Sequence, residues 1–259
     1  MTEHRKEYVV FRLCVMAWLF GWYYKYWFFY GYFGHETFDF PVITPQFPQF
    51  FLHNGVALVV YYLPVFCLPA LFIERRAISL SIAATLLVCA TILGLHIDTY
   101  NDMTFISSFW IALWLLWFAY HIDDRAHIAR HAPFLAKCII GLLFLGGTVG
   151  KLTPQYWSGE AFYNLVVRET PGYVGTFLLT HFSVEEQKMI IGYLSKGIII
   201  FEGLLALSPL YPYRIFCAFG IFSIAMLVLF RGLQILSVLS CLAGMTLACL
   251  LIMRGRAAQ

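Results

Sequence analysis

Charge is scarce in this sequence. Only 12% of its 259 residues are Asp, Glu, Lys or Arg, whereas 61% are apolar; soluble domains carry about 25% charged and 45–50% apolar residues. A chain of this length has too little interior to bury so much apolar surface. The net charge of +3, without a cluster of Lys and Arg, is not the footprint of a nucleic-acid-binding protein. These shortages exclude a soluble globule, a disordered chain and a nucleic-acid binder, and they leave a polytopic membrane protein.

Several motifs with a defined chemistry are also missing. There is no Walker or dinucleotide-binding glycine motif, no G-x-S-x-G elbow of the hydrolases and no repeat of the kind found in transporters. The seven cysteines lie in apolar runs and form no C-x-x-C pair, which indicates packing residues. His96 and Asp98 have the chemistry of metal ligands, but no histidine stands at helical or zinc-finger spacing from them. We therefore predict no metal site.

What the sequence has in abundance is long apolar runs. A helix needs about 20 apolar residues to cross the bilayer core. Eight runs qualify as candidates: 9–33, 51–72, 78–95, 105–120, 134–150, 189–207, 215–230 and 233–253. The first run lacks a signal-peptide cleavage site and is too long for one, so we interpret it as a retained span. The sequence predicts an all-α bundle of about eight transmembrane helices, forming a single membrane domain over residues 1–259.

The distribution of Lys and Arg predicts the orientation. Alternate loops, beginning with the N-terminus, hold nine of these residues, and the opposite loops hold four. Because cytoplasmic loops carry the excess of positive charge, we expect both termini in the cytoplasm and the long loop 151–188 outside. We expect an integral protein of a bacterial inner membrane.

Ionisable residues inside the apolar runs are costly and mark a bundle interior or a cavity by default. Arg12 and Lys137 lie near the cytoplasmic ends of their spans, where a long side chain can reach the interface. Lys25 lies deeper, on an aromatic surface. Glu202, in IIIFEGLLALSP, is the most informative of the group, because it has no oppositely charged residue one turn away. Both a structural hydrogen-bonding role and a functional role are open for it.

The long outer loop begins with a predicted short interfacial helix. A glycine-rich helix ends near Lys151, where the Thr153-Pro154 pair breaks it. We expect Ser158 to cap a short helix with Glu160 in its first turn, and Trp157 to anchor this helix at the interface. Further along, Ser183 and Glu186 have the spacing of a capping box at the start of the sixth span.

Residues 145–163, LGGTVGKLTPQYWSGEAFY, resemble the lysine segment of the vitamin K-dependent carboxylase-like membrane proteins, the horizontally transferred transmembrane (HTTM) family. The family pattern is a helix ending in G-x-x-K-L, three residues, then W-x-x-G. Lys151, Leu152 and Gly159 match it, while Thr148 and Tyr156 stand where the first Gly and the Trp belong. Residues 201–209, FEGLLALSP, resemble the family's following span. The DoxX-like quinol-linked membrane proteins share a similar G-x-x-K-L helix end.

The resemblance implies a lysine that acts as the base on a reduced, vitamin K-like quinol. Burial beside an apolar, aromatic-rich site favours the neutral amine, which can act as a general base. Lys151, Glu160 and Glu202 are the expected catalytic residues. The expected substrate-binding residues are Trp157 and four polar residues of the loop HIDTYND: His96, Asp98, Asn101 and Asp102.

Departures from the family pattern limit what the resemblance implies. The family's histidine before the fourth span is missing from Tyr100-Asn101-Asp102-Met103, and the run 215–230 contains no histidine. No domain for glutamate-rich substrates is expected, so complete glutamate carboxylation is not expected either. Two classes stay open: an enzyme, whether a carboxylase- or epoxidase-like lyase or a quinol-linked oxidoreductase, and a non-catalytic subunit. The second class includes a maturation or immunity partner of a membrane or secreted protein.

Overall fold

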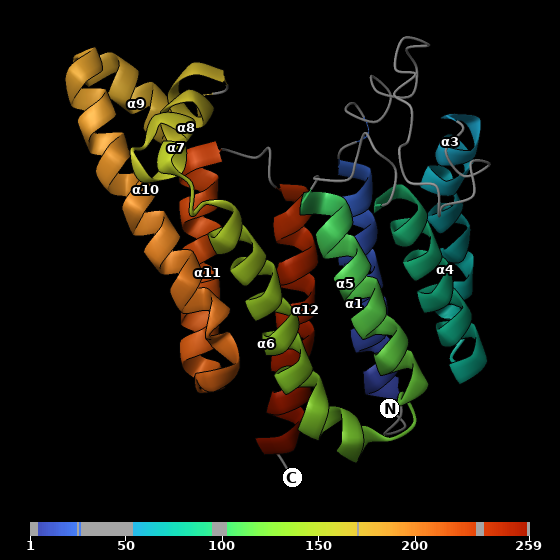
Figure 1. The fold of residues 1–259 in the computed structure, drawn as a ribbon. Helices are drawn as coiled ribbons and strands as arrows, with labels where there is room; N and C mark the ends of the chain where they lie inside the picture. Colours follow the sequence, from blue (N-terminus) through green and yellow to red (C-terminus); the bar gives the residue numbers. More distant parts are fainter. Residues whose placement is uncertain are drawn as a thin grey trace. The chain divides into compact units, whose positions relative to one another are not determined.

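The computed structural model describes residues 5–24, 26, 54–94, 103–169, 171–231 and 236–257, and all regular structure within these ranges is helical (Figure 1). This confirms the all-α prediction for the described part of the chain. Among the described residues, five helical segments are long and apolar enough to cross a membrane: Gly55–Phe72, Arg76–Gly94, Arg125–Gly150, Val184–Ala206 and Tyr213–Phe230. They indicate an integral membrane protein, while the number of eight spans stays a prediction.

The chain divides into two compact units. The first comprises Met1–Ala136 with Leu236–Gln259, and the second comprises Lys137–Ile235. Helix α6 (Arg125–Gly150) contributes residues to both. The prediction of one membrane domain over residues 1–259 stays a prediction.

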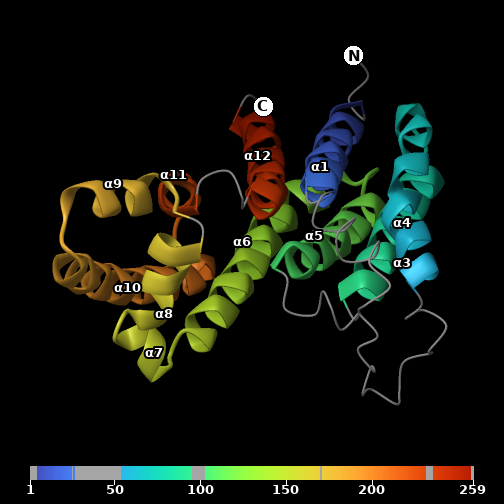
Figure 2. The same ribbon diagram turned by 90° about the horizontal axis from the view of Figure 1, so that it is seen from above.

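In the first unit, helix α5 (Met103–Tyr120) packs against α4 (Arg76–Gly94) and α1 (Arg5–Tyr24), and α12 (Leu236–Ala257) lies along α1 (Figures 1 and 2). Small residues allow the close approach of α1 and α12. A Cβ on Gly21 would collide with the carbonyl oxygen of Ser237, and a Cβ on Gly244 would collide with Ala17. Such glycine contacts are typical of helix pairs in membranes, where packing replaces the hydrophobic effect between helices.

The second predicted span is a broken helix. It consists of α3 (Asn54–Tyr62) and two 3₁₀ turns, η2 (Leu63–Cys67) and η3 (Pro69–Phe72), each with a proline at its start. Proline removes a backbone donor and disturbs the helical ladder. Trp22 Nε1 and the Tyr23 hydroxyl of α1 both donate to the carbonyl oxygen of Tyr61, each at 3.0 Å. A neighbouring helix therefore satisfies a backbone group near the break, as a membrane interior requires.

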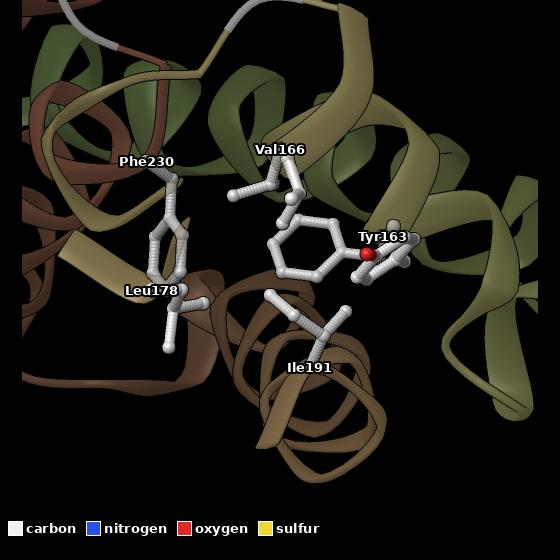
Figure 3. Packing of buried hydrophobic residues seen from close by; sticks show 7 residues of the cluster. Tyr163, Val166, Leu178, Ile191 and Phe230 are labelled. Atoms are coloured by element: carbon white, nitrogen blue, oxygen red, sulfur yellow. The ribbon is translucent and has the colours of Figure 1, made fainter. Parts of the chain in front are cut away.

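The second unit is organised around α10 (Val184–Ala206). Against it pack the short helices α7 (Pro154–Trp157), α8 (Glu160–Tyr163) and α9 (Tyr173–His181). The π-helical turn η4 (Asn164–Glu169) contacts α8 and α9, and α11 (Tyr213–Arg231) contacts α9. The core of this arrangement is a cluster of buried apolar residues that includes Tyr163, Val166, Leu178, Ile191 and Phe230 (Figure 3).

Helix termini in the second unit test three local predictions. The break after α6 is confirmed: Thr153 accepts a hydrogen bond from the Tyr156 amide as the N-cap of α7, and Pro154 takes the first helical position. The capping box at Ser183 and Glu186 is also confirmed.

The prediction that Ser158 caps the next helix is wrong. Gly159, with a left-handed φ of 87°, holds the N-cap position of α8. The Ser158 hydroxyl accepts only a 3.4 Å bond from the Glu160 amide. The turn needs a positive φ immediately before the helix, which glycine adopts without steric cost and serine does not. Glu160 occupies the first turn of α8, as expected.

Replacing Gly141 with Ala is expected to lower the free energy of unfolding by about 1–3 kcal/mol. Its Cβ would lie 2.9 Å from the Ala206 carbonyl oxygen and 3.2 Å from Pro209 Cδ, so backbone would have to move. Gly146→Ala, on the same helix, is the matched control, because its Cβ meets no atom within 4 Å among the described residues. The Gly146→Ala replacement should raise the free energy of unfolding by about 1 kcal/mol, because alanine has the higher helix propensity. Unfolding experiments in mixed detergent micelles measure the free energy of unfolding of both variants. Equal changes in the two variants would contradict the packing at Gly141.

Candidate functional site

Lys151 and Glu202 form an ion pair in the second unit. Lys151 Nζ lies 2.9 Å from Oε1 and 2.7 Å from Oε2 of Glu202, although the two residues are 51 positions apart in the sequence. The Lys151 side chain is 26% exposed and the Glu202 side chain 14%. The two ionisable residues that the sequence marks as costly or family-like are therefore one charge-balanced pair, and one edge of it is accessible.

A third acceptor completes the surroundings of the amine. The carbonyl oxygen of Gly147, one turn earlier in α6, lies 3.4 Å from Lys151 Nζ. Gly147 also borders the pair directly, since a Cβ there would lie 3.4 Å from Glu202 Oε2 and 3.6 Å from Lys151 Nζ. The absence of a side chain at Gly147 keeps a methyl group away from both charged atoms.

The local sequence explains why Lys151 stands where it does. Helix α6 ends at Gly150, and the Lys151 amide closes the last turn with a 3.0 Å bond to the Thr148 carbonyl. The capped turn at Thr153 then sends the chain into α7. Lys151 thus lies at a rigid helix end and extends its side chain back toward Gly147, as side chains on helices do.

Helix α10 contacts the first of the two segments that resemble the carboxylase-like proteins and contains most of the second. The Ser195 hydroxyl donates to the Tyr156 carbonyl oxygen at 2.6 Å, and the turn at Gly159 lies directly against the backbone of Gly192. Residues 192, 195 and 202 follow helical spacing and share one face of α10. The turn after α7 and the ion pair therefore lie along the same face of one helix.

The other predicted site residues do not join this pair. Glu160 is exposed at the start of α8, and no hydrogen bond or ion pair connects it to Lys151 or Glu202. The Trp157 side chain is 49% exposed, as an interfacial anchor or an open wall would be. His96, Asp98, Asn101 and Asp102 lie outside the described residues.

Two more cations of the apolar runs have acceptors. Arg12 forms a 2.9 Å ion pair with Glu74. Lys137 donates to the carbonyl oxygens of Pro209 and Tyr211 at 3.1 and 2.8 Å. Lys196 differs from these, because its amine lies 5.9 Å from the ring centre of Tyr193. Lys137 therefore donates to backbone carbonyls of the turn that follows α10, and the Lys196 amine lies near an aromatic ring of α10 itself.

A histidine cluster at the turn from α5 to α6 escaped the sequence analysis. The ring centres of His121 and His127 are 4.1 Å apart, those of His127 and His131 are 4.5 Å apart, and Trp117 borders both His121 and His127. Burial is the main cause that lowers the pKa of His121 from its ordinary value, and the neighbouring His127 lowers it further. The four-residue spacing of His127 and His131, which places both on one face of a helix, is the signal for this cluster in the sequence.

The described residues contain no arrangement of metal-ligating side chains. Within these ranges no group of three His, Cys, Asp or Glu side chains is placed to hold a metal ion. The expectation of no metal stays a prediction.

The first unit has an open apolar groove of about 360 Å³. It is lined by Met16, Leu19, Phe20, Tyr23, Tyr24, Val65 and Leu68. Among the described residues that line it, none carries a carboxylate, amine, guanidinium or imidazole group, so this lining suits contact with hydrocarbon. The acid–base chemistry of the described residues is better represented by the Lys151–Glu202 pair.

Comparisons of the chain with models of protein families, with curated proteins and with solved structures gave no match. The long apolar helices indicate an integral membrane protein, and an ion pair lies at the end of its helix α6.

Proposed function

We propose that this protein is a membrane enzyme of the carboxylase-like type that acts on a lipophilic quinol at the Lys151–Glu202 pair. One observation carries the proposal: the lysine of the family-like segment 145–163 and the glutamate of the FEGLLALSP segment meet at 2.7 Å. Ionisable residues in membrane-spanning segments are functional candidates by default.

The chemistry of the pair suits a quinol. A quinol is largely apolar, can enter from the bilayer, and carries a weakly acidic hydroxyl. The pair offers this hydroxyl a carboxylate that can accept a proton and a cation that can stabilise the resulting negative charge. Because both side chains remain partly exposed, a ligand can reach them without opening the core.

The test is turnover of candidate quinols by the purified protein in lipid nanodiscs, under air and with bicarbonate. Lys151→Ala should reduce the consumption of naphthoquinol and benzoquinol by at least about 100-fold, the usual contribution of a positioned acid–base group. Lys196→Ala is the matched control, as a lysine of the same unit that faces an aromatic ring, and should keep wild-type turnover. Unchanged turnover in Lys151→Ala would overturn the proposal.

The product separates the two enzyme classes that the sequence left open. A quinone as the product indicates a quinol-linked oxidoreductase, with oxygen as the electron acceptor. An epoxide of the quinone indicates the carboxylase-like reaction. Mass spectrometry of the extracted lipids identifies both, and it also reports any quinone that copurifies with the protein.

A second candidate function is a non-catalytic membrane subunit or maturation partner. The observation that favours it is the set of three acceptors around Lys151 Nζ, which lets the pair serve as a clamp between α6 and α10. In this case a stoichiometric protein partner copurifies, no quinone is bound, and no quinol is consumed.

A further inference from the structure

The lysine amine in the pair has three acceptor atoms around it among the described residues. An ammonium group has three N–H donors and no acceptor, and Lys151 Nζ lies within hydrogen-bond distance of three acceptor atoms: both Glu202 oxygens and the Gly147 carbonyl. A neutral amine has only two donors and would turn its lone pair toward one of these oxygens. The three acceptors around Lys151 therefore match in number the three donors of an ammonium group.

The Glu202 carboxylate, in contrast, can accept further hydrogen bonds. Each carboxylate oxygen has two lone pairs, and the described residues supply Glu202 with one donor group, the Lys151 ammonium. With 14% of its side chain exposed, Glu202 can still receive a proton from a molecule at the open edge. Of the two partners, only the glutamate is poised to accept a proton.

We infer that Glu202 is the base of the site and that Lys151 stays a cation that stabilises the anion formed. This inference rests on the proposed function and assigns its two roles. The quinol O–H bond breaks, its proton moves to a Glu202 oxygen, and its electron pair remains on the quinol oxygen as a quinolate facing the Lys151 ammonium. The net charge of the site is zero before and after the step.

The same charge balance defines the substrate class. An anionic ligand would have to compete with the Glu202 carboxylate for Lys151, and this would leave a carboxylate without its partner, which is costly away from water. A neutral molecule with an acidic hydroxyl needs no such exchange. The site is therefore built for a neutral weak acid, such as a quinol or another phenol, and not for a carboxylate or a phosphate.

Replacing each residue with a chemically similar amino acid separates the two roles. Arginine keeps the positive charge but cannot be deprotonated in a protein, so Lys151→Arg should keep turnover within about tenfold of wild type. Glu202→Gln removes the base and should lose at least about 100-fold. Glu202→Asp, which keeps a carboxylate on a shorter side chain, should fall between them. If Lys151→Arg is as inactive as Lys151→Ala while Glu202→Gln retains activity, the assignment is overturned.

A binding experiment tests the inference without turnover. A naphthol that absorbs differently as a neutral molecule and as an anion is added to the protein in nanodiscs without oxygen. Wild type and Lys151→Arg should bind it and show the band of the anion, and Glu202→Gln should bind it as the neutral form. An anion band in Glu202→Gln that disappears in Lys151→Arg would overturn the assignment. If wild-type protein binds no naphthol and consumes no quinol, the proposed function itself fails, which is a different result from either of these.

Discussion

Replacing Glu202 with Leu should lower the free energy of unfolding by about 2 kcal/mol, because the Lys151 ammonium is left without its counter-charge. Removing one partner of a fully buried ion pair costs about 3–5 kcal/mol. The value expected here is smaller because 26% of the Lys151 side chain is exposed to solvent. The remaining acceptor is the Gly147 carbonyl at 3.4 Å, which cannot replace a carboxylate.

The double variant Lys151→Met/Glu202→Leu is the informative control. It removes both charges together and leaves two apolar side chains of similar size, so its stability should lie within about 1 kcal/mol of wild type. Unfolding in mixed micelles, followed by tryptophan fluorescence, gives the coupling energy from the wild type, the two single variants and the double variant. Additive effects of the two single replacements would contradict a direct interaction between Lys151 and Glu202.

Gly159→Ala is expected to lower the free energy of unfolding by about 2–5 kcal/mol. Two causes act together. The φ of 87° is a left-handed conformation that costs a residue with a Cβ about 1–2 kcal/mol. The added Cβ would also lie 2.6 Å from Gly192 Cα, so the turn would have to move away from α10 at a cost of about 1–3 kcal/mol.

Gly197→Ala is the matched control for this replacement. Gly197 lies inside α10, and an added Cβ meets no atom within 4 Å among the described residues. Alanine should therefore stabilise the helix by about 1 kcal/mol. The same unfolding experiment measures both variants, and a stability of Gly159→Ala equal to that of Gly197→Ala would be incompatible with the turn and its contact with α10.

Local sequence signals predicted the helix ends well where a specific residue sets them. The predicted end of the run 134–150 coincides with the end of α6, because the Thr153-Pro154 pair starts a new helix. The start of α6 was predicted nine residues too late, since hydropathy does not follow its polar first part from Arg125. The Ser183 capping box was predicted correctly, whereas the cap of α8 required a backbone conformation that only Gly159 supplies.

The composition by itself determined that this chain belongs in a membrane, because its apolar residues are too many for the interior of a soluble protein of this size. The sequence also determined which charges are unusual, since a charge within an apolar run is visible without a structure. Only the tertiary structure decided that Lys151 and Glu202 are partners. Lys151 follows the end of α6 and Glu202 lies in α10, and helical periodicity describes the faces of one helix but not which faces meet. Packing of α10 against the end of α6 and the turn at Gly159 brings the two charges together.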